Sequence, residues 1–298
     1  MGISKSKISY LPFRLSSKLL EIAEKSNDWL TKDVKNQLKN FDAIYASTKD
    51  FEWKYLPRDN YLKLIRQVGK TKDSELFRYA NHLFLSHLVR IAEAYQFTAT
   101  WRVGELTAAA IRALNSNQPL AAAAVCRSMF EVAIHFVTDA SFIKKALKNI
   151  PYDKINCGFI ELERIELEFE RLVNANRHVE KTDSMFQTNI MTKIQWLDKN
   201  FGKQGKGHEI EPKYSILCEA THPNHLGYRR FNSASDLNED TSWVSWKMSK
   251  NSKGEESNYI IENCIWTISW THWVMSENFL KVEEGKLAFL NALGRPLP

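Results

Sequence analysis

One apolar run limits the folds that are open to this chain. Residues 119–137 are largely apolar, and their only ionisable side chains other than a cysteine are Arg127, Glu131 and His135. A charge at the centre of a bilayer costs about 2.5–3.5 kcal/mol on insertion scales. The run therefore predicts a buried helix, over about 119–147, in a soluble protein that does not enter a membrane.

Turn-forming residues are too scarce for most β-rich folds. The 298 residues include 11 glycines and 8 prolines. Their combined fraction of the chain is about half of the ~12% that is usual for these two residues. Sandwiches and barrels need such residues at most strand ends. Because 44% of the residues are hydrophobic and 12% aromatic, the chain can fill a core, which excludes wholesale disorder. The composition predicts an all-α multi-helix bundle.

Apolar residues at helical spacing divide the chain into elements. Helices are expected over about 14–50, 74–115, 119–147, 160–178, 184–200, 213–222 and 257–282. Residues 1–70 form an N-terminal helical extension in this interpretation, and residues 71–298 form the bundle core. Residues 226–257 are polar and irregular, and the alternation in 242–250 favours a short strand or β-hairpin arm.

Cysteine spacing and charge exclude some functions and leave others open. The four cysteines are far apart and form no CxxC pair, so a zinc ribbon or finger is not expected. Instead we expect the cysteines to be reduced thiols in a cytoplasmic protein. The first 120 residues hold 19 Lys and Arg against 12 Asp and Glu. This basic third is compatible with a nucleic-acid surface. Because its lysines are spaced apart, an ordinary solvated surface is the favoured interpretation.

The ionisable side chains of the apolar helix form the first candidate site. Arg127, Glu131 and His135 recur every four residues, so they line one stripe of a helix. An unpaired buried charge is costly, so the stripe is expected to be paired internally or to face a cleft. Two interpretations stay open, a structural Arg127–Glu131 salt bridge and a functional site.

A second candidate site lies near residues 214–230. Helical spacing places Tyr214, Cys218, Glu219 and His222 on nearby faces of one short helix. His225, Arg229 and Arg230 follow it. Histidine can act as a general acid or base near neutral pH, and Glu219, His222 and His225 are also candidate metal ligands. A structural helix end is the favoured interpretation, with a catalytic histidine and a metal site as alternatives.

The two sites together carry a resemblance to a known family. The sequence resembles an uncharacterised bacterial family, domain of unknown function 5677, over residues 75–285. The residues that carry this resemblance are Arg127, Ser128, Glu131, Tyr214, Cys218, Glu219, His222 and Pro223. That family looks like a relative of HEPN domains, helical bundles of which many are metal-independent ribonucleases. They act, often as dimers, in toxin–antitoxin and antiviral defence systems.

The resemblance implies a function but departs from the HEPN catalytic motif. That motif is an Arg, a polar residue after it, and a His four to six residues later. Arg171 and His178 have this spacing, but Leu172 follows the Arg, and seven residues separate Arg127 from His135. A ribonuclease interpretation therefore places Arg127 and Glu131 opposite His222 across a cleft. The other site residues expected to bind substrate are Tyr214, Glu219, His225, Arg229 and Arg230.

In this interpretation His222 activates the 2′-OH of RNA and Arg127 stabilises the charged phosphorane, so no cofactor is required. RNA is the expected partner, together with a second copy of the chain or a partner protein, in the cytoplasm. Two alternatives remain. One is a non-enzymatic interaction or scaffold protein with a structural Arg127–Glu131 pair, and the other is a metal-binding protein that uses Glu219, His222 and His225.

Overall fold

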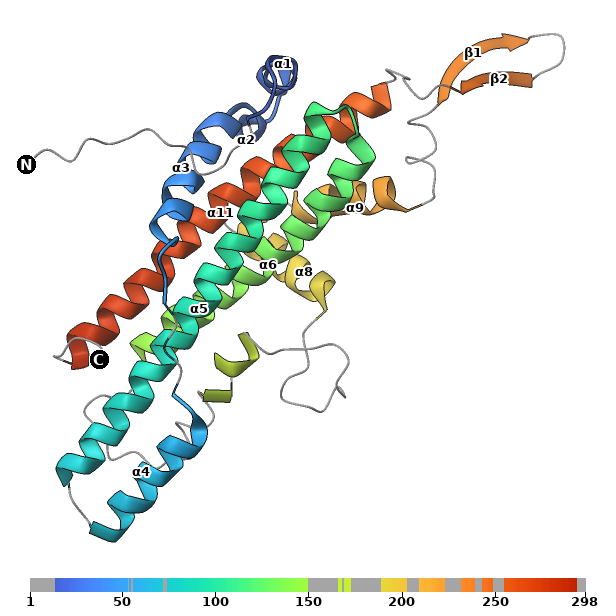
Figure 1. Ribbon diagram of the computed structural model, residues 1–298. Helices are drawn as coiled ribbons and strands as arrows, with labels where there is room; N and C mark the ends of the chain where they lie inside the picture. The colour runs from blue at the N-terminus through green and yellow to red at the C-terminus, as the bar shows by residue number, and fades with distance from the viewer. Residues whose placement is uncertain are drawn as a thin grey trace, which may run out of the picture. The chain divides into compact units, whose positions relative to one another are not determined.

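A computed structural model gives the fold (Figure 1). It describes residues 14–52, 54, 56–71, 74–149, 166–167, 169–172, 189–202, 209–222, 232–238, 243–248 and 255–293. The helices are α1 (Ser17–Lys25), α2 (Trp29–Lys32), α3 (Val34–Ser47), α4 (Arg58–Thr71), α5 (Ser74–Asn115), α6 (Pro119–Lys148), α8 (Ile190–Gly202), α9 (Ile210–Thr221) and α11 (Glu255–Leu293). The predicted all-α bundle is confirmed.

Two short strands form a hairpin between α9 and α11. β1 (Asn232–Asn238) pairs with β2 (Trp243–Met248) in antiparallel register, with Asn232 opposite Met248. The register shifts between Ala234 and Leu237, which marks a bulge or irregularity in the pairing. The hairpin lies in the stretch 226–257, where the sequence predicts one, and it leaves the helical class of the fold unchanged.

Several helix boundaries differ from those expected. The stretch 14–50 forms three helices instead of one or two, because the Asp28 carboxylate accepts the Thr31 N–H (3.0 Å) and so begins a new helix. α11 continues past residue 282 to Leu293. Gly285 lets this part of α11 pack closely on α6, since a Cβ there would lie 3.0 Å from the Cα of Lys144. Most of the helix predicted over 160–178 lies outside the described residues.

The turn between α5 and α6 shows how local sequence ends one helix and begins the next. Asn117 adopts a left-handed conformation (φ 55°), which asparagine tolerates better than most residues. The Gln118 N–H donates to the Ala113 carbonyl (2.8 Å) and the Asn117 N–H to the Leu114 carbonyl (3.0 Å), the pattern of a Schellman motif. Pro119 then opens α6 at the first helical position, as the sequence predicts.

The chain divides into two compact units. The first unit comprises Met1–Ser47, Trp101–Ile134 and Ile190–Ser276, and the second comprises Thr48–Thr100, His135–Asn189 and Glu277–Pro298. The long helices α5, α6 and α11 each contribute residues to both. This grouping differs from the division at residue 70, which stays a prediction about domains.

Aromatic side chains form the core of the first unit. Phe130 of α6 is fully buried and packs edge-on against Trp270 of α11, with ring centroids 4.6 Å apart. Trp266 stacks on Trp270 at 6.0 Å, and both are at most 3% exposed. Trp266 and Trp270 therefore contribute to the aromatic core of this unit. Trp273 instead packs at 6.0 Å against the half-exposed Trp29.

The apolar helix α6 is buried over much of its length. By length and composition alone it is long and apolar enough to cross a membrane, but half of its most apolar window is buried inside the structure. Its buried positions include Cys126, Met129, Phe130 and Ala133, all at 0% exposure. A core helix passes the same test of length and composition. This burial agrees with the prediction that α6 packs inside the protein.

Candidate functional site

The position of α9 is set by a carboxylate on the preceding helix. Asp198 of α8 is 5% exposed and accepts the backbone N–H groups of Ile210 (3.0 Å) and Glu211 (2.9 Å). These N–H groups belong to the first turn of α9, where they have no partner within the helix. Asp198 therefore anchors the start of α9, and α9 begins at Ile210 instead of the predicted residue 213. Tyr214 follows one turn later.

Tyr214 brings the two sequence motifs together. Its hydroxyl donates to Glu131 Oε1 at 2.6 Å, a short bond from α9 to α6. Arg127 Nε lies 3.4 Å from the same Glu131 oxygen and donates to the Tyr214 hydroxyl, also at 3.4 Å. The Arg127 guanidinium carbon lies 5.7 Å from the centre of the Tyr214 ring. We call Arg127, Glu131 and Tyr214 the α6–α9 cluster.

The electrostatics of the α6–α9 cluster favour a protonated tyrosine. Burial, and after it the hydrogen bond to Glu131, raise the pKa of Tyr214 to about 12. Tyr214 is 4% exposed, so it remains a neutral donor at physiological pH. The hydrogen bond to Tyr214 also raises the pKa of Arg127, which stays a cation. At neutral pH the cluster thus holds a permanent positive charge beside a carboxylate that is already hydrogen-bonded.

Arg127 is the member of the cluster with unused donors. Its side chain is 33% exposed, and that of Glu131 is 36% exposed. Its contacts to Tyr214 and Glu131 use Nε, and at 3.4 Å they are longer than a usual N–H···O bond. Among the residues that the structure describes, neither terminal nitrogen of Arg127 donates a hydrogen bond. A planar fork of this kind suits a carboxylate or phosphate ligand.

His222 lies apart from these three residues. It is the exposed C-cap of α9, and its backbone N–H donates to the Cys218 carbonyl at 3.0 Å. It lies eight positions after Tyr214, which corresponds to about 12 Å along the helix axis. The contacts of Arg127 in the described part of the chain do not include His222. The structure therefore joins Arg127 and Glu131 to Tyr214 and not to the histidine that the sequence suggests.

The remaining predicted site residues have mixed outcomes. Cys218, one turn after Tyr214, is half-buried and close enough to Arg127 to act on its pKa. Glu219 is exposed on the same helix, and after burial its charge is the next cause that raises the pKa of Tyr259. His225, Arg229 and Arg230 lie outside the described residues. Within the described ranges no group of three His, Cys, Asp or Glu side chains could hold a metal ion.

The third residue of the predicted stripe, His135, belongs to the second unit. The stripe continues one turn further to Asp139, which accepts a hydrogen bond from the half-buried Tyr95 of α5 at 2.6 Å. Burial, followed by the proximity of Asp139, raises the pKa of Tyr95. Sequence reasoning missed this pair, although the spacing of four residues from His135 to Asp139 was a usable signal.

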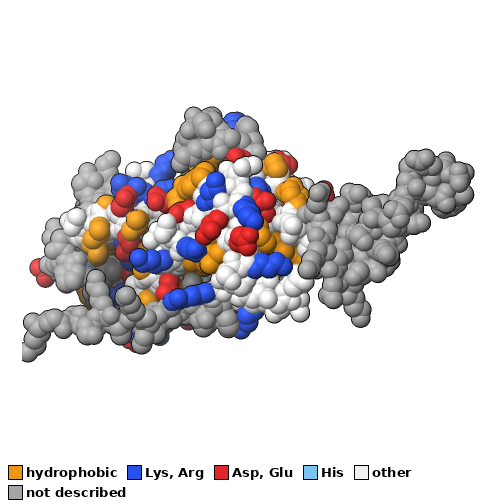
Figure 2. Space-filling model, turned by 90° about the horizontal axis from the view of Figure 1, so that it is seen from above, with side chains coloured by type: hydrophobic (Ala, Val, Ile, Leu, Met, Phe, Trp, Pro, Cys, Tyr) orange, Lys and Arg blue, Asp and Glu red, His pale blue; other side chains and the backbone are white. Residues whose placement is uncertain are grey.

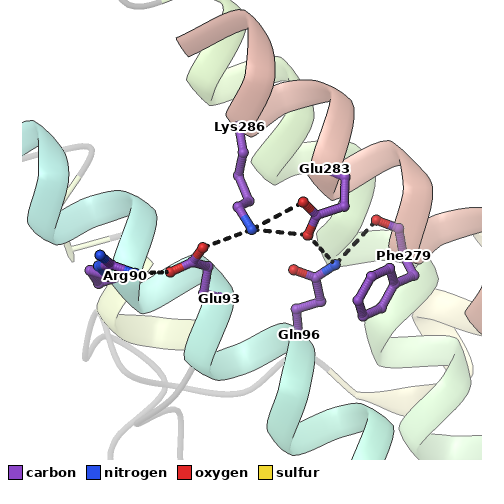
Figure 3. Close-up of polar contacts among 6 residues, drawn as sticks. All are labelled: Arg90, Glu93, Gln96, Phe279, Glu283 and Lys286. Atoms are coloured by element: carbon purple, nitrogen blue, oxygen red, sulfur yellow. Dashed lines mark hydrogen bonds and ion pairs between the residues drawn. The ribbon is translucent and has the colours of Figure 1, made fainter. Parts of the chain in front are cut away.

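The second unit also contains a polar network that the sequence analysis does not predict (Figure 3). Lys286 of α11 lies 2.8 Å from Glu93 of α5 and 2.9 Å from Glu283. Arg90 pairs with Glu93 at 2.9 Å, and Gln96 donates to Glu283 at 3.0 Å. We call these five residues the α5–α11 network. Lys286 and Glu93, at the centre of the network, are only 10% and 11% exposed, while Glu283 is 34% exposed.

Comparisons with known proteins add no family. No protein-family model matches the sequence. Searches of curated proteins and of solved structures also find no similar chain. The geometry of the side chains is therefore the basis for a functional conclusion.

Proposed function

We propose that this chain is a HEPN-like RNA-binding protein of the bacterial cytoplasm, in which Arg127 contacts a phosphate of the RNA backbone. The observation that carries the proposal is the pair of unused terminal nitrogens on a partly exposed guanidinium. Tyr214 and Glu131 hold this guanidinium from the Nε side. A bound phosphate would accept two parallel N–H bonds, the arrangement that arginine makes with phosphates.

The same geometry supports binding better than cleavage. A ribonuclease without metal needs a base near the 2′-OH and a cation near the phosphate. Glu131 accepts a hydrogen bond from the Tyr214 hydroxyl at 2.6 Å, and His222 lies about two helical turns from Tyr214 along α9. We therefore propose RNA binding as the primary activity. Its role in a defence or toxin system, and a dimeric or partner-bound state, belong to the proposal as consequences of the family resemblance.

A second candidate function is a non-enzymatic interaction protein. The short Tyr214–Glu131 hydrogen bond favours it, because this bond joins α6 to α9 without help from any ligand. In that case Arg127 only balances the charge of Glu131. The two candidates differ in one respect, namely whether the terminal nitrogens of Arg127 contact an anion.

Titration of a fluorescently labelled single-stranded RNA with the purified chain tests the proposal. The wild type is compared with Arg127→Gln, which removes the fork but keeps the length and polarity of the side chain. Arg102→Gln is the matched control, because Arg102 is an exposed arginine of the same unit. We expect Arg127→Gln to weaken binding about tenfold, the value of one good charge-assisted contact. Arg102→Gln should change it little.

Equal affinities of Arg127→Gln and the wild type would favour the interaction protein. Incubation of total RNA and tRNA with the chain in EDTA tests cleavage in parallel, beside His222→Ala. Metal-independent cleavage that is lost in both Arg127→Gln and His222→Ala would establish a ribonuclease. Far-UV circular dichroism of every variant confirms that the helices are retained.

A further inference from the structure

The start of α9 is fixed by a proline inside the helix and a carboxylate outside it. The first turn of a helix leaves N–H groups without partners in the helix. Pro212 has no N–H group, so the other residues of this turn, Ile210 and Glu211, carry the amides that need an acceptor. Asp198 of α8 accepts both, one with each carboxylate oxygen, at 3.0 and 2.9 Å. Asp198 and Pro212 together account for this turn.

The N-cap residue of α9 supplies no such acceptor. Ser, Thr, Asp or Asn usually occupies this position, because its side chain accepts an amide of the first turn. Glu209 occupies it in α9, and its side chain makes no capping hydrogen bond. Pro212 blocks an earlier start, because a proline in a helix interior clashes with the carbonyl four residues before it. Asp198, which is 5% exposed, therefore decides where α9 begins.

The start of α9 also decides which way Tyr214 points. Successive residues of a helix are about 100° and about 1.5 Å apart. Ile210, Tyr214 and Leu217 belong to the buried stripe of α9, and all three are at most 4% exposed. If α9 slipped by one residue against Asp198, Tyr214 would turn by about 100° and lose its 2.6 Å hydrogen bond to Glu131. The two hydrogen bonds to Asp198 oppose this slip, because they hold two successive amides.

The neighbouring helix α11 holds the same part of α9 as well. Asn263 is 2% exposed, and its amide donates to the Lys213 carbonyl at 3.2 Å. The Lys213 ammonium lies 5.1 Å from the centre of the Trp266 ring. This contact holds the backbone beside Tyr214 by one hydrogen bond, whereas Asp198 holds the helix start by two. The competing explanation for the position of Tyr214 is therefore α11 alone.

The placement of a single cation matters on a surface of mixed charge. On the face shown in Figure 2, Lys and Arg side chains lie among Asp and Glu side chains. Where both signs are interspersed, an anion meets little long-range attraction, and local contacts decide whether it binds. Arg127 is held on its Nε side by the Tyr214 hydroxyl and Glu131. The direction of its terminal nitrogens thus depends on where Tyr214 lies.

We propose that Asp198 is a positioning residue for the anion that Arg127 binds. Asp198 sets the register of α9, this register places the Tyr214 hydroxyl, and the hydroxyl holds Arg127 at Nε. Both carboxylate oxygens of Asp198 are occupied by N–H groups, so its contribution to binding is indirect. The inference rests on the proposed function for the identity of the anion, an RNA phosphate. The positioning itself rests on the contacts between α8, α9 and α6.

The first test is titration of labelled single-stranded RNA with the full chain and with Asp198→Ala. The matched control is Asp28→Ala, because Asp28 caps α2 in the same unit by accepting the Thr31 N–H at 3.0 Å. Both variants should lower the urea midpoint of unfolding, since each loses a helix cap. We expect Asp198→Ala to weaken RNA binding about fourfold and Asp28→Ala to change it little. Equal losses in both variants would overturn the proposal in favour of a general loss of stability.

A conservative variant keeps the test decisive if Asp198→Ala does not fold. Asp198→Asn retains the size of the side chain and one acceptor oxygen, so it should keep one of the two hydrogen bonds. We expect it to be folded by circular dichroism and to bind RNA with an affinity between those of Asp198→Ala and the wild type. A folded Asp198→Asn variant with wild-type affinity and a wild-type Tyr214 pKa would overturn the proposal.

A double variant shows whether Asp198 acts through Arg127. Effects of two residues on one contact are not additive. Asp198→Ala should therefore weaken binding in the wild type and add almost nothing in a chain that already carries Arg127→Gln. Losses that add fully would show that Asp198 affects binding elsewhere, and they would overturn the proposal.

The ionisation of Tyr214 gives a readout without RNA. Burial and the hydrogen bond to Glu131 raise the pKa of Tyr214 to about 12. In Asp198→Ala this pKa should fall toward the ordinary value of about 10, because Tyr214 leaves its buried position. Tyrosinate absorbance measures it, as the difference between each protein and the same protein with Tyr214→Phe. Asp28→Ala should leave it at the wild-type value. An unchanged pKa in Asp198→Ala would show that α11 alone positions Tyr214 and would overturn the proposal.

Failure of this inference is distinguishable from failure of the proposed function. If the wild type does not bind RNA but the Tyr214 pKa falls in Asp198→Ala, the proposed function fails and the positioning by Asp198 stands. If Arg127→Gln loses RNA binding and Asp198→Ala does not, the proposed function stands and the positioning by Asp198 is overturned.

Discussion

The two polar clusters of this protein use similar residues under different exposure. In the α5–α11 network Lys286 and Glu93 are about one tenth exposed, and each has a charged partner within 3 Å. In the α6–α9 cluster Arg127 and Glu131 are about one third exposed, and their shortest separation is 3.4 Å. A buried charge must be paired to be tolerated, whereas water solvates a partly exposed one. The lower exposure of Lys286 and Glu93 fits a network that holds helices together. The higher exposure of Arg127 leaves its cation available to a ligand.

Removal of one charge from the closed network should have the largest effect. We expect Glu93→Ala to lower the free energy of unfolding by about 3 kcal/mol, because it leaves Lys286 and Arg90 with too little compensation. Urea denaturation followed by circular dichroism measures the change. The double variant Glu93→Leu, Lys286→Met should recover most of the loss, since it removes both charges together. A stable Glu93→Ala variant would end the contrast between the two clusters.

The second prediction tests whether burial keeps a histidine of the first unit, His272, from being protonated. His272 of α11 is fully buried, stacks on Phe41 at 4.4 Å, and lies 2.8 Å from the Thr107 hydroxyl. Burial lowers the pKa of His272 to about 3. Because the unfolded chain binds this proton from about pH 6.5 downward and the folded chain does not, stability is lost as the pH falls from about 6.5 toward 3.

At pH 5 this histidine should account for a loss of about 2 kcal/mol relative to pH 8. His272→Gln keeps a hydrogen-bonding group near Thr107 but does not titrate. Urea denaturation of both proteins at several pH values isolates the contribution of the histidine. The gap in stability between wild type and His272→Gln should shift in favour of the variant as the pH falls. If the difference in stability between the two proteins does not change with pH, folding does not lower the pKa of His272 and the prediction is wrong.

The third prediction concerns the open cluster and is the smallest. Arg127→Gln should change the free energy of unfolding by less than about 0.5 kcal/mol, the usual value for a partly exposed ion pair. Tyr214→Phe should cost about 1 kcal/mol, since it removes the 2.6 Å bond to Glu131. Thermal and urea unfolding of both variants measure these values. A loss above about 2 kcal/mol for Arg127→Gln would assign Arg127 to structure and sharpen the case for an interaction protein.

Local patterns predicted the elements better than their partners. The helix over 119–147 agrees with α6 to within a residue, because Pro119 favours its start and apolar residues recur at helical spacing. The Arg127–Glu131 pair was also predictable, since four residues on a helix place two side chains together. The ribonuclease interpretation places His222 opposite Arg127, and the sequence does show that Tyr214 and His222 belong to one short helical segment. It does not show which end of α9 lies near Arg127.

The amino-acid sequence by itself determined the helical class, the boundaries of α5 and α6, and the spacing of charges along each helix. These features depend on residues a few positions apart, so propensity, capping and periodicity are sufficient. Tertiary structure alone decided that Tyr214 meets Glu131 across 83 residues. It also decided that Lys286 meets Glu93 across nearly two hundred. Such contacts arise from the packing of whole helices, in which burial and shape select among many pairings that the sequence leaves equally open.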